Sequence, residues 1–255
     1  DNKQGKRRKQ RTFIKMGSIA FISPQANLAK NMTDPRGKVL LLLFLVSTYF
    51  SDGARVAAQG TSKHDESCPP VTTAPDFDLE LYTSKRWFVH QQAPTQYVPV
   101  ERNFCVYADY DVLEKKTFPW GYEVSVFNHA ENKEGEEFGG PLCAFADDSN
   151  NLAKLKVAPC FLPKYLAGPY WVLAYDEKKG YALVSGGQPT IRREGGCTTG
   201  EGINDSGLWI FLRTQERNEV LIKEARAVAK KFDIDLSVLN DVDHTNCNHN
   251  IESNT

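Results

Sequence analysis

Three apolar segments near the end of the chain decide its fold: Gly168–Asp176 (GPYWVLAYD), Tyr181–Ser185 (YALVS) and Leu208–Thr214 (LWIFLRT). Each is short and mixes aromatic with β-branched residues, which is typical of β-strands. Residues 218–232 follow with a helical period, and their apolar stripe consists of Leu221, Ala225, Val228 and Phe232. The C-terminal half therefore predicts three strands and then one helix.

Upstream of these segments the sequence predicts five more strands, over residues 85–89, 103–113, 120–127, 138–145 and 152–157. Strands and helices do not alternate, which excludes a parallel sheet. Eight strands in succession predict an all-β fold, an eight-stranded antiparallel up-and-down barrel with one C-terminal α-helix packed outside. A barrel of this size is just wide enough to hold one small ligand. The glycine-rich segment 186–207 is predicted to be a long loop.

Charge divides the chain into two parts. Residues 1–58 carry 11 Lys and Arg against 3 acidic residues, whereas the remainder carries 20 against 29. The acidic part argues against nucleic acid or an anionic membrane surface as the main partner.

The basic segment contains the pattern of a targeting leader. Residues 39–50 are an apolar run that is too short to be a permanent membrane span, and small residues follow it at Val56–Ala58. We therefore expect a signal or bipartite presequence over 1–58, an N-terminal arm over 59–76, and the barrel with its helix and tail over 77–255. Export by secretion is the first expectation, and a plastid (thylakoid) lumen is the alternative.

Six cysteines lie after the predicted leader, at positions 68, 105, 143, 160, 197 and 247. An even number in an exported domain indicates disulfides, and six cysteines allow 15 pairings. No two of them are spaced as CxxC, so the sequence predicts neither a zinc site nor any other metal or cofactor.

The order of these segments resembles the lipocalins, among them the apolipoprotein D-like, bacterial and plastid members. Trp87 matches the tryptophan that closes one end of their barrel, although Lys85 stands where the family has glycine. Arg213 matches the arginine that lies across this tryptophan and donates to nearby carbonyls. Such a cation–π contact is worth roughly 0.5–2 kcal/mol.

The resemblance also implies how the cysteines pair. Many lipocalins join the C-terminal tail to the second strand, which here implies Cys105 with Cys247. Some join the N-terminal segment to a loop between late strands, which implies Cys68 with Cys197. Cys143 and Cys160 then form the third pair.

A small hydrophobic ligand, such as a fatty acid, sterol, retinoid or carotenoid-like molecule, is the partner that the resemblance implies. Trp209 and Tyr110 match pocket aromatics of the family, and three further aromatic residues are candidates to line the pocket: Tyr122, Phe127 and Phe138. The mouth loops, including the segment 186–207, are the candidate surface for a protein partner.

The sequence is also similar to the lipocalin domain of violaxanthin de-epoxidase, an enzyme that reduces a carotenoid epoxide. Opening an epoxide requires an acid that protonates the departing oxygen. The positions that match the catalytic residues of that enzyme hold Gly168 and Phe211, neither of which can donate a proton. We therefore expect binding without catalysis.

Asn204-Asp-Ser206 is a glycosylation acceptor motif. Because the motif lies in the predicted long loop, Asn204 is expected to carry a glycan if the chain follows a secretory route.

Overall fold

The computed structural model describes residues 67–247. The predicted leader over 1–58 lies outside the described residues, as do the first part of the arm and the last eight residues. The division into leader, arm and barrel therefore stays a prediction. Within residues 67–247, no helix combines the length and the apolar composition that a membrane span requires.

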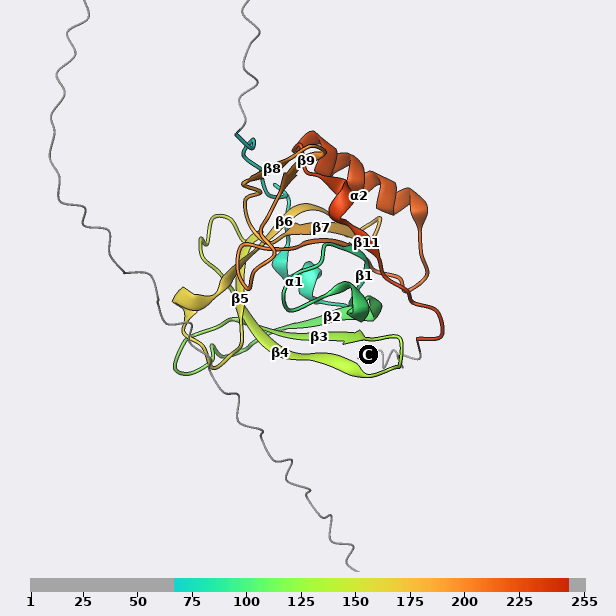
Figure 1. Cartoon of the computed structure of the whole chain (residues 1–255). Helices are drawn as coiled ribbons and strands as arrows, with labels where there is room; N and C mark the ends of the chain where they lie inside the picture. The colour runs from blue at the N-terminus through green and yellow to red at the C-terminus, as the bar shows by residue number, and fades with distance from the viewer. Residues whose placement is uncertain (1–66, 248–255) are drawn as a thin grey trace, which may run out of the picture. The chain divides into compact units, whose positions relative to one another are not determined.

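Eight strands form the barrel, and their order along the chain is also their order around the sheet (Figure 1). They are β1 (Trp87–Gln92), β2 (Phe104–Val112), β3 (Val124–Glu131), β4 (Glu137–Ala146), β5 (Lys154–Ala158), β6 (Gly168–Asp176), β7 (Tyr181–Ser185) and β10 (Leu208–Leu212). The last strand pairs antiparallel with the first, with Val89 opposite Phe211 and Gln92 opposite Trp209. This pairing closes the sheet and confirms the predicted antiparallel up-and-down barrel.

The segment between residues 113 and 123 differs from the prediction. The sequence predicts a strand from residue 120, but β3 begins at Val124. Thr117 holds residues 117–122 in a turn, because its hydroxyl accepts from the backbone N–H of Tyr122 at 2.9 Å and its carbonyl accepts from Gly121 at 2.6 Å. The alternating buried residues 122, 124 and 126 therefore begin two positions before β3 does.

Short elements complete the described chain. The loop 186–207 contains a hairpin of β8 (Ile191–Arg193) and β9 (Gly196–Thr198), and β11 (Asn240–Asp241) pairs with the end of β1. The helical elements are α1 (Leu79–Thr83), α2 (Glu219–Lys231) and three 3-10 turns, η1 (Val100–Arg102), η2 (Lys164–Leu166) and η3 (Leu236–Val238).

Helix α2 packs on the outside of the barrel, as predicted (Figure 1). Asn218 caps its N-terminus, because the side-chain oxygen accepts from the N–H groups of Val220 and Leu221. Three side chains of the helix are buried against outward-facing residues of β6, β7 and β10: Ile222, Ala225 and Ala229. The rest of the predicted stripe is partly buried against the same cluster.

The barrel interior holds a second apolar cluster. Alternate residues of each strand face inward, and they include Val106, Ala108, Val172, Val184 and Phe211. Tyr82 from α1 and Trp87 join this cluster, and both are fully buried. The two apolar clusters thus lie on opposite faces of the strands that carry α2.

All three disulfides that the resemblance implied are present. Cys68 bonds to Cys197 and Cys105 to Cys247, across 129 and 142 residues of sequence. Cys143 bonds to Cys160 across 17 residues. No cysteine of residues 67–247 remains free. Three disulfides are typical of proteins that fold in an oxidising compartment.

Two histidines connect the C-terminal tail to the barrel wall. His90 in β1 is fully buried, and its Nε2 lies 2.9 Å from the carbonyl oxygen of Thr214. His244 in the tail lies with its ring centroid 4.9 Å from that of His90, and its Nε2 lies 2.8 Å from the carbonyl oxygen of Val89. Each ring therefore contacts a backbone carbonyl from a segment distant in sequence.

Acidification between pH 6.5 and pH 4 is expected to destabilise the fold through His90. The pKa of His90 is lowered to about 4, mainly by burial and also by the charges of His244 and Arg217, while the Thr214 carbonyl and Glu219 act in the opposite direction. The unfolded chain binds a proton near pH 6.5, which the folded chain does not bind until about pH 4. The contribution of neutral His90 to stability is therefore fully present above pH 6.5. The free energy of unfolding decreases by about 3 kcal/mol as the pH falls to 4.

Urea unfolding of wild type and His90→Gln at a series of pH values measures this contribution. The variant should lose most of the slope in this window, because the pKa values of Asp241 and Asp243 are lowered and their titration lies below it. An equal slope in both proteins would contradict the assignment to His90.

Candidate ligand-binding site

Trp87 fills the end of the barrel at which β1 begins. Its Nε1 donates to the carbonyl oxygen of Tyr82 at 2.8 Å. The guanidinium of Arg213 lies 3.6 Å from the centre of the indole. Arg213 also donates to the carbonyl oxygens of Leu81 and Tyr82, at 2.8 and 3.1 Å, and its Nη2 lies 2.8 Å from a carboxylate oxygen of Glu177. The predicted clasp of Arg213 on Trp87 is confirmed.

The chain thus combines three features: a closed barrel of eight antiparallel strands, a helix outside it, and an arginine held across a tryptophan at one end. The fold is that of a lipocalin.

Solved lipocalin-type structures resemble the chain at low sequence identity. Lobster apocrustacyanin A1 matches with a TM-score of 0.48 and 14% identity, over 71% of this chain and 92% of that chain. The cockroach allergen Per a 4 matches with 0.48 and 15%, over 72% and 98%. H1 crustacyanin from Homarus americanus matches with 0.44 and 13%, over 71% and 92%. No family model matches the chain, and no curated protein matches it.

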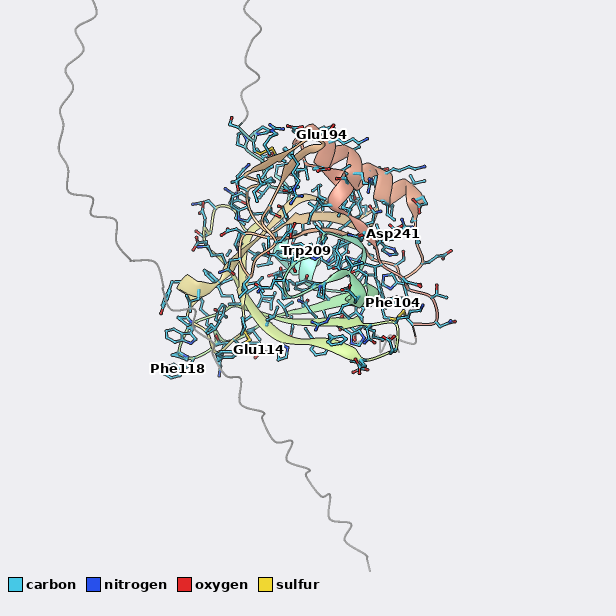
Figure 2. The ribbon with its side chains drawn as sticks, in the orientation of Figure 1. Phe104, Glu114, Phe118, Glu194, Trp209 and Asp241 are labelled. Carbon is cyan, nitrogen blue, oxygen red and sulfur yellow. A yellow bond between two sulfur atoms is a disulfide. The ribbon has the colours of Figure 1, made fainter. Side chains whose placement is uncertain are left out.

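Three of the five predicted pocket aromatics come together inside this lipocalin barrel. Trp209, Tyr110 and Phe138 all pack against the interior cluster but stay partly exposed. Figure 2 shows Trp209 near the middle of the barrel. These three side chains therefore face the interior and still contact solvent.

The other two predicted pocket aromatics lie elsewhere. Tyr122 belongs to a small cluster around the Cys143–Cys160 disulfide, apart from the interior cluster, and its hydroxyl donates to the carbonyl oxygen of Leu162 at 2.9 Å. Phe127 is 46% exposed, although its neighbour Val126 is buried. Phe127 follows the alternation of β3 and faces outward. The structure therefore does not bring Tyr122 or Phe127 to the interior aromatics.

The backbone at Gly207 positions Trp209. Gly207 has a φ of +103°, and a Cβ atom at this residue would lie 2.1 Å from Cη2 of the Trp209 indole. Only glycine combines this backbone conformation with so close an approach of a ring. The indole lies roughly parallel to the ring of Tyr170, with centroids 6.3 Å apart and an interplanar angle of 25°.

Tyr170 is the centre of a group of three tyrosines that sequence reasoning missed. Its hydroxyl lies 2.6 Å from that of Tyr82 and 2.8 Å from that of Tyr110. We call these three residues the tyrosine triad. The alternation of β6 places Tyr170 on the inward face together with Val172, so this signal was present in the sequence. Tyr82 comes from α1, for which no strand pattern exists.

A cation at the barrel mouth was also missed. The guanidinium of Arg102, from η1, lies 4.0 Å from the ring centre of Phe138. Its Nη1 donates to the carbonyl oxygen of Tyr97 at 3.3 Å. Arg102 thus places a charged group next to Phe138, one of the interior aromatic residues.

A separate cavity of about 380 Å³ lies beside the barrel mouth. The segment 186–207 contributes Thr198, Thr199 and Glu201 to its lining, and Leu208 and Val238 contribute apolar surface. None of its lining residues belongs to the interior cluster. This cavity is therefore separate from the interior aromatic residues Trp209, Tyr110 and Phe138.

The two positions that match catalytic residues of the de-epoxidase have clear structural roles here. A Cβ atom on Gly168 would lie 2.5 Å from Oδ1 of the exposed Asn204, so a larger side chain at this position would displace the Asn204 side chain. Phe211 is buried inside the barrel, with its ring centroid 6.4 Å from that of Trp87. Asn204 is exposed and its Nδ2 donates to the carbonyl oxygen of Leu166 at 3.3 Å; its glycosylation stays a prediction.

Among residues 67–247, no group of three or more His, Cys, Asp or Glu side chains is arranged to hold a metal ion.

Proposed function

We propose that this lipocalin binds a small hydrophobic ligand inside the barrel, in contact with Trp209, Tyr110 and Phe138. The observation that carries the proposal is that these inward-facing aromatic residues stay partly exposed, although Trp87 and Tyr82 fill the closed end. Fatty acids, sterols, retinoids and carotenoid-like molecules have suitable size and polarity. Enclosing such a ligand gains about 25 cal/mol per Å² of apolar surface removed from water, so no dedicated charge is required.

We further propose that the ligand is carried without being transformed. The de-epoxidase chemistry needs a proton donor near the epoxide, and Gly168 and Phe211 stand at the matching positions. Turnover of an epoxy-carotenoid with ascorbate would contradict this part of the proposal.

Export is part of the proposed function. The three disulfides support an oxidising compartment, and the predicted leader supports secretion, with a plastid lumen as the alternative. N-terminal sequencing of the mature protein, together with its location in the cell, distinguishes the two.

Contact quenching by a brominated ligand tests the position of the ligand. Methyl 9,10-dibromostearate is apolar, and its bromine atoms quench only tryptophans in their vicinity. We expect saturable quenching in wild type, loss of about half of it or more in Trp209→Phe, and little change in Trp120→Phe. Trp120 is the matched control, because it lies in an outer loop and donates to the carbonyl oxygen of Phe161.

Equal quenching in wild type and Trp209→Phe would place the ligand elsewhere. Mass spectrometry of an organic extract of the purified protein provides an independent measurement, because a carried ligand should co-purify in a stoichiometric amount.

The cavity beside the mouth supports a second candidate function. Its 380 Å³ would accommodate a side chain of a protein partner, and the loop 186–207 forms much of its wall. Under this alternative, shortening the loop would abolish capture of the partner and leave quenching by the brominated ester unchanged.

A further inference from the structure

The most exposed large apolar side chains lie on two loops of the barrel. Among the described residues, Phe118, Tyr165 and Phe161 have the three largest exposed fractions of this kind, 97%, 83% and 78%. Phe118 belongs to the loop 113–123 between β2 and β3, and the other two belong to the loop 159–167 between β5 and β6. Figure 2 shows Phe118 at the outer edge of the molecule. Contiguous exposed apolar groups mark interaction surfaces.

Hydrogen bonds and a disulfide hold these two loops together. Nε1 of Trp120 donates to the carbonyl oxygen of Phe161 at 3.0 Å, and the hydroxyl of Tyr122 donates to the carbonyl oxygen of Leu162 at 2.9 Å. The disulfide of Cys160 ties the second loop to β4. The exposed rings therefore share one supported surface, and we call the loops 113–123 and 159–167 the paired loops.

Lysines supply most of the charge on this surface. The paired loops carry three lysines, at positions 115, 116 and 164, and two acidic residues, Glu114 and Glu123. Both acidic residues stand at the ends of the first loop, and Glu123 pairs with Lys116. Lysines beside protruding aromatic rings match the headgroup region of a bilayer that contains anionic lipids, because aromatic rings favour this depth and lysines favour its charge.

The extent of the exposure favours a fluid surface over a folded protein as the partner. A side chain that is 97% exposed, as Phe118 is, stands away from its own chain and forms no wall of a groove. A folded partner would need a pocket of matching shape for each ring, whereas rings enter the interface of a bilayer without such complementarity. Each aromatic side chain can remove about 150–250 Å² from water.

We propose that the paired loops bind to the surface of a bilayer that contains anionic lipids, with Phe118, Phe161 and Tyr165 inserted at the level of the headgroups. This inference is independent of the ligand proposed for the barrel interior. The excess of acidic residues in 59–255 opposes the approach to such a surface, but the Debye length is only about 8 Å at physiological ionic strength. The lysines next to the inserted rings therefore govern the contact itself.

Sedimentation with sucrose-loaded vesicles tests the proposal. The vesicles contain one part phosphatidylserine to three parts phosphatidylcholine. The double variant Phe118→Ser/Phe161→Ser should weaken the partition of the protein by about tenfold or more, because two rings no longer leave water. Lys115→Gln should weaken it about fivefold, the typical contribution of one lysine near an anionic surface. Vesicles of phosphatidylcholine alone should bind wild type more weakly than the mixed vesicles.

Ile191→Ser/Val220→Ser is the matched control. Ile191 in β8 and Val220 in α2 are 44% and 66% exposed and lie outside the paired loops. Vesicle binding of this variant should stay within about twofold of wild type. Because both double variants replace exposed side chains, urea unfolding should show that both remain folded.

Tryptophan fluorescence locates the contact. Trp120 lies in the first of the paired loops and is 39% exposed. Vesicles made with brominated phosphatidylcholine should therefore quench Trp120 when the loops insert. We expect Trp120→Phe to lose about half of the quenching or more, and Trp209→Phe to retain it. The second variant separates contact at the loops from uptake of a lipid into the barrel.

Three outcomes would overturn the inference. The first is that wild type does not sediment with the mixed vesicles, or sediments no more than Phe118→Ser/Phe161→Ser. The second is a dimer of wild type that binds no vesicles and that the same variant converts to a monomer, which would assign the surface to a second copy of the chain. The third is quenching that Trp209→Phe abolishes and Trp120→Phe retains, which would place the lipid in the barrel and support the proposed function instead.

Discussion

Trp87→Ala is expected to lower the free energy of unfolding by about 3–5 kcal/mol. The substitution opens a cavity at the closed end of the barrel, where Trp87 contacts the rings of Tyr82, Tyr175 and Phe211 with centroids 5.2, 6.3 and 6.4 Å away. It also removes the surface on which Arg213 lies and the donor to the Tyr82 carbonyl. Urea unfolding at neutral pH measures the loss.

Trp120→Ala is the control for Trp87→Ala. The indole of Trp120 is 39% exposed and lies in the loop between β2 and β3. Its loss should cost about 1 kcal/mol, the typical worth of its hydrogen bond to the Phe161 carbonyl. Similar costs for the two substitutions would mean that the closed end does not depend on its tryptophan.

Removal of the Cys105–Cys247 disulfide should destabilise the protein by about 4–5 kcal/mol. The bond joins residues 142 positions apart, and in the chain-entropy model the stabilisation grows with the length of the loop that the bond closes. The double variant Cys105→Ser/Cys247→Ser therefore increases the conformational entropy of the unfolded chain, which favours unfolding.

Cys143→Ser/Cys160→Ser provides the comparison, because that bond spans only 17 residues and should contribute about 3 kcal/mol. Unfolding of both double variants under the same conditions ranks the two contributions. A larger loss from the shorter loop would show that packing around that disulfide outweighs chain entropy.

The strands of the barrel were predictable because their alternation of inward and outward residues is regular. The outer helix was predictable for the same reason, since its stripe of Leu221, Ala225, Val228 and Phe232 repeats with the helical period. The clasp of Arg213 on Trp87 and the cysteine pairing came from the resemblance to lipocalins. Local sequence patterns do not indicate contacts between residues that lie more than 120 positions apart in the chain.

The pocket was only partly predictable. Composition alone favoured Tyr122 and Phe127 as pocket residues, but a turn held by Thr117 precedes β3 and the alternation of β3 turns Phe127 outward. Tyr82 reaches the barrel floor because α1 packs there, which depends on tertiary structure. A count of aromatic residues therefore indicates that a pocket exists, whereas strand register decides which residues form it.

The long disulfide has one more consequence, which concerns the connectivity of a cleaved chain. Residues 201–205 in the loop before β10 are exposed, so a protease would meet the chain here. A cut between Gly202 and Ile203 would leave Cys105 in one fragment and Cys247 in the other, and the disulfide would keep them joined. The severed β10 would also keep both neighbours, because it pairs with β1 and β7. The barrel would thus remain one covalent unit after losing a peptide bond at its mouth.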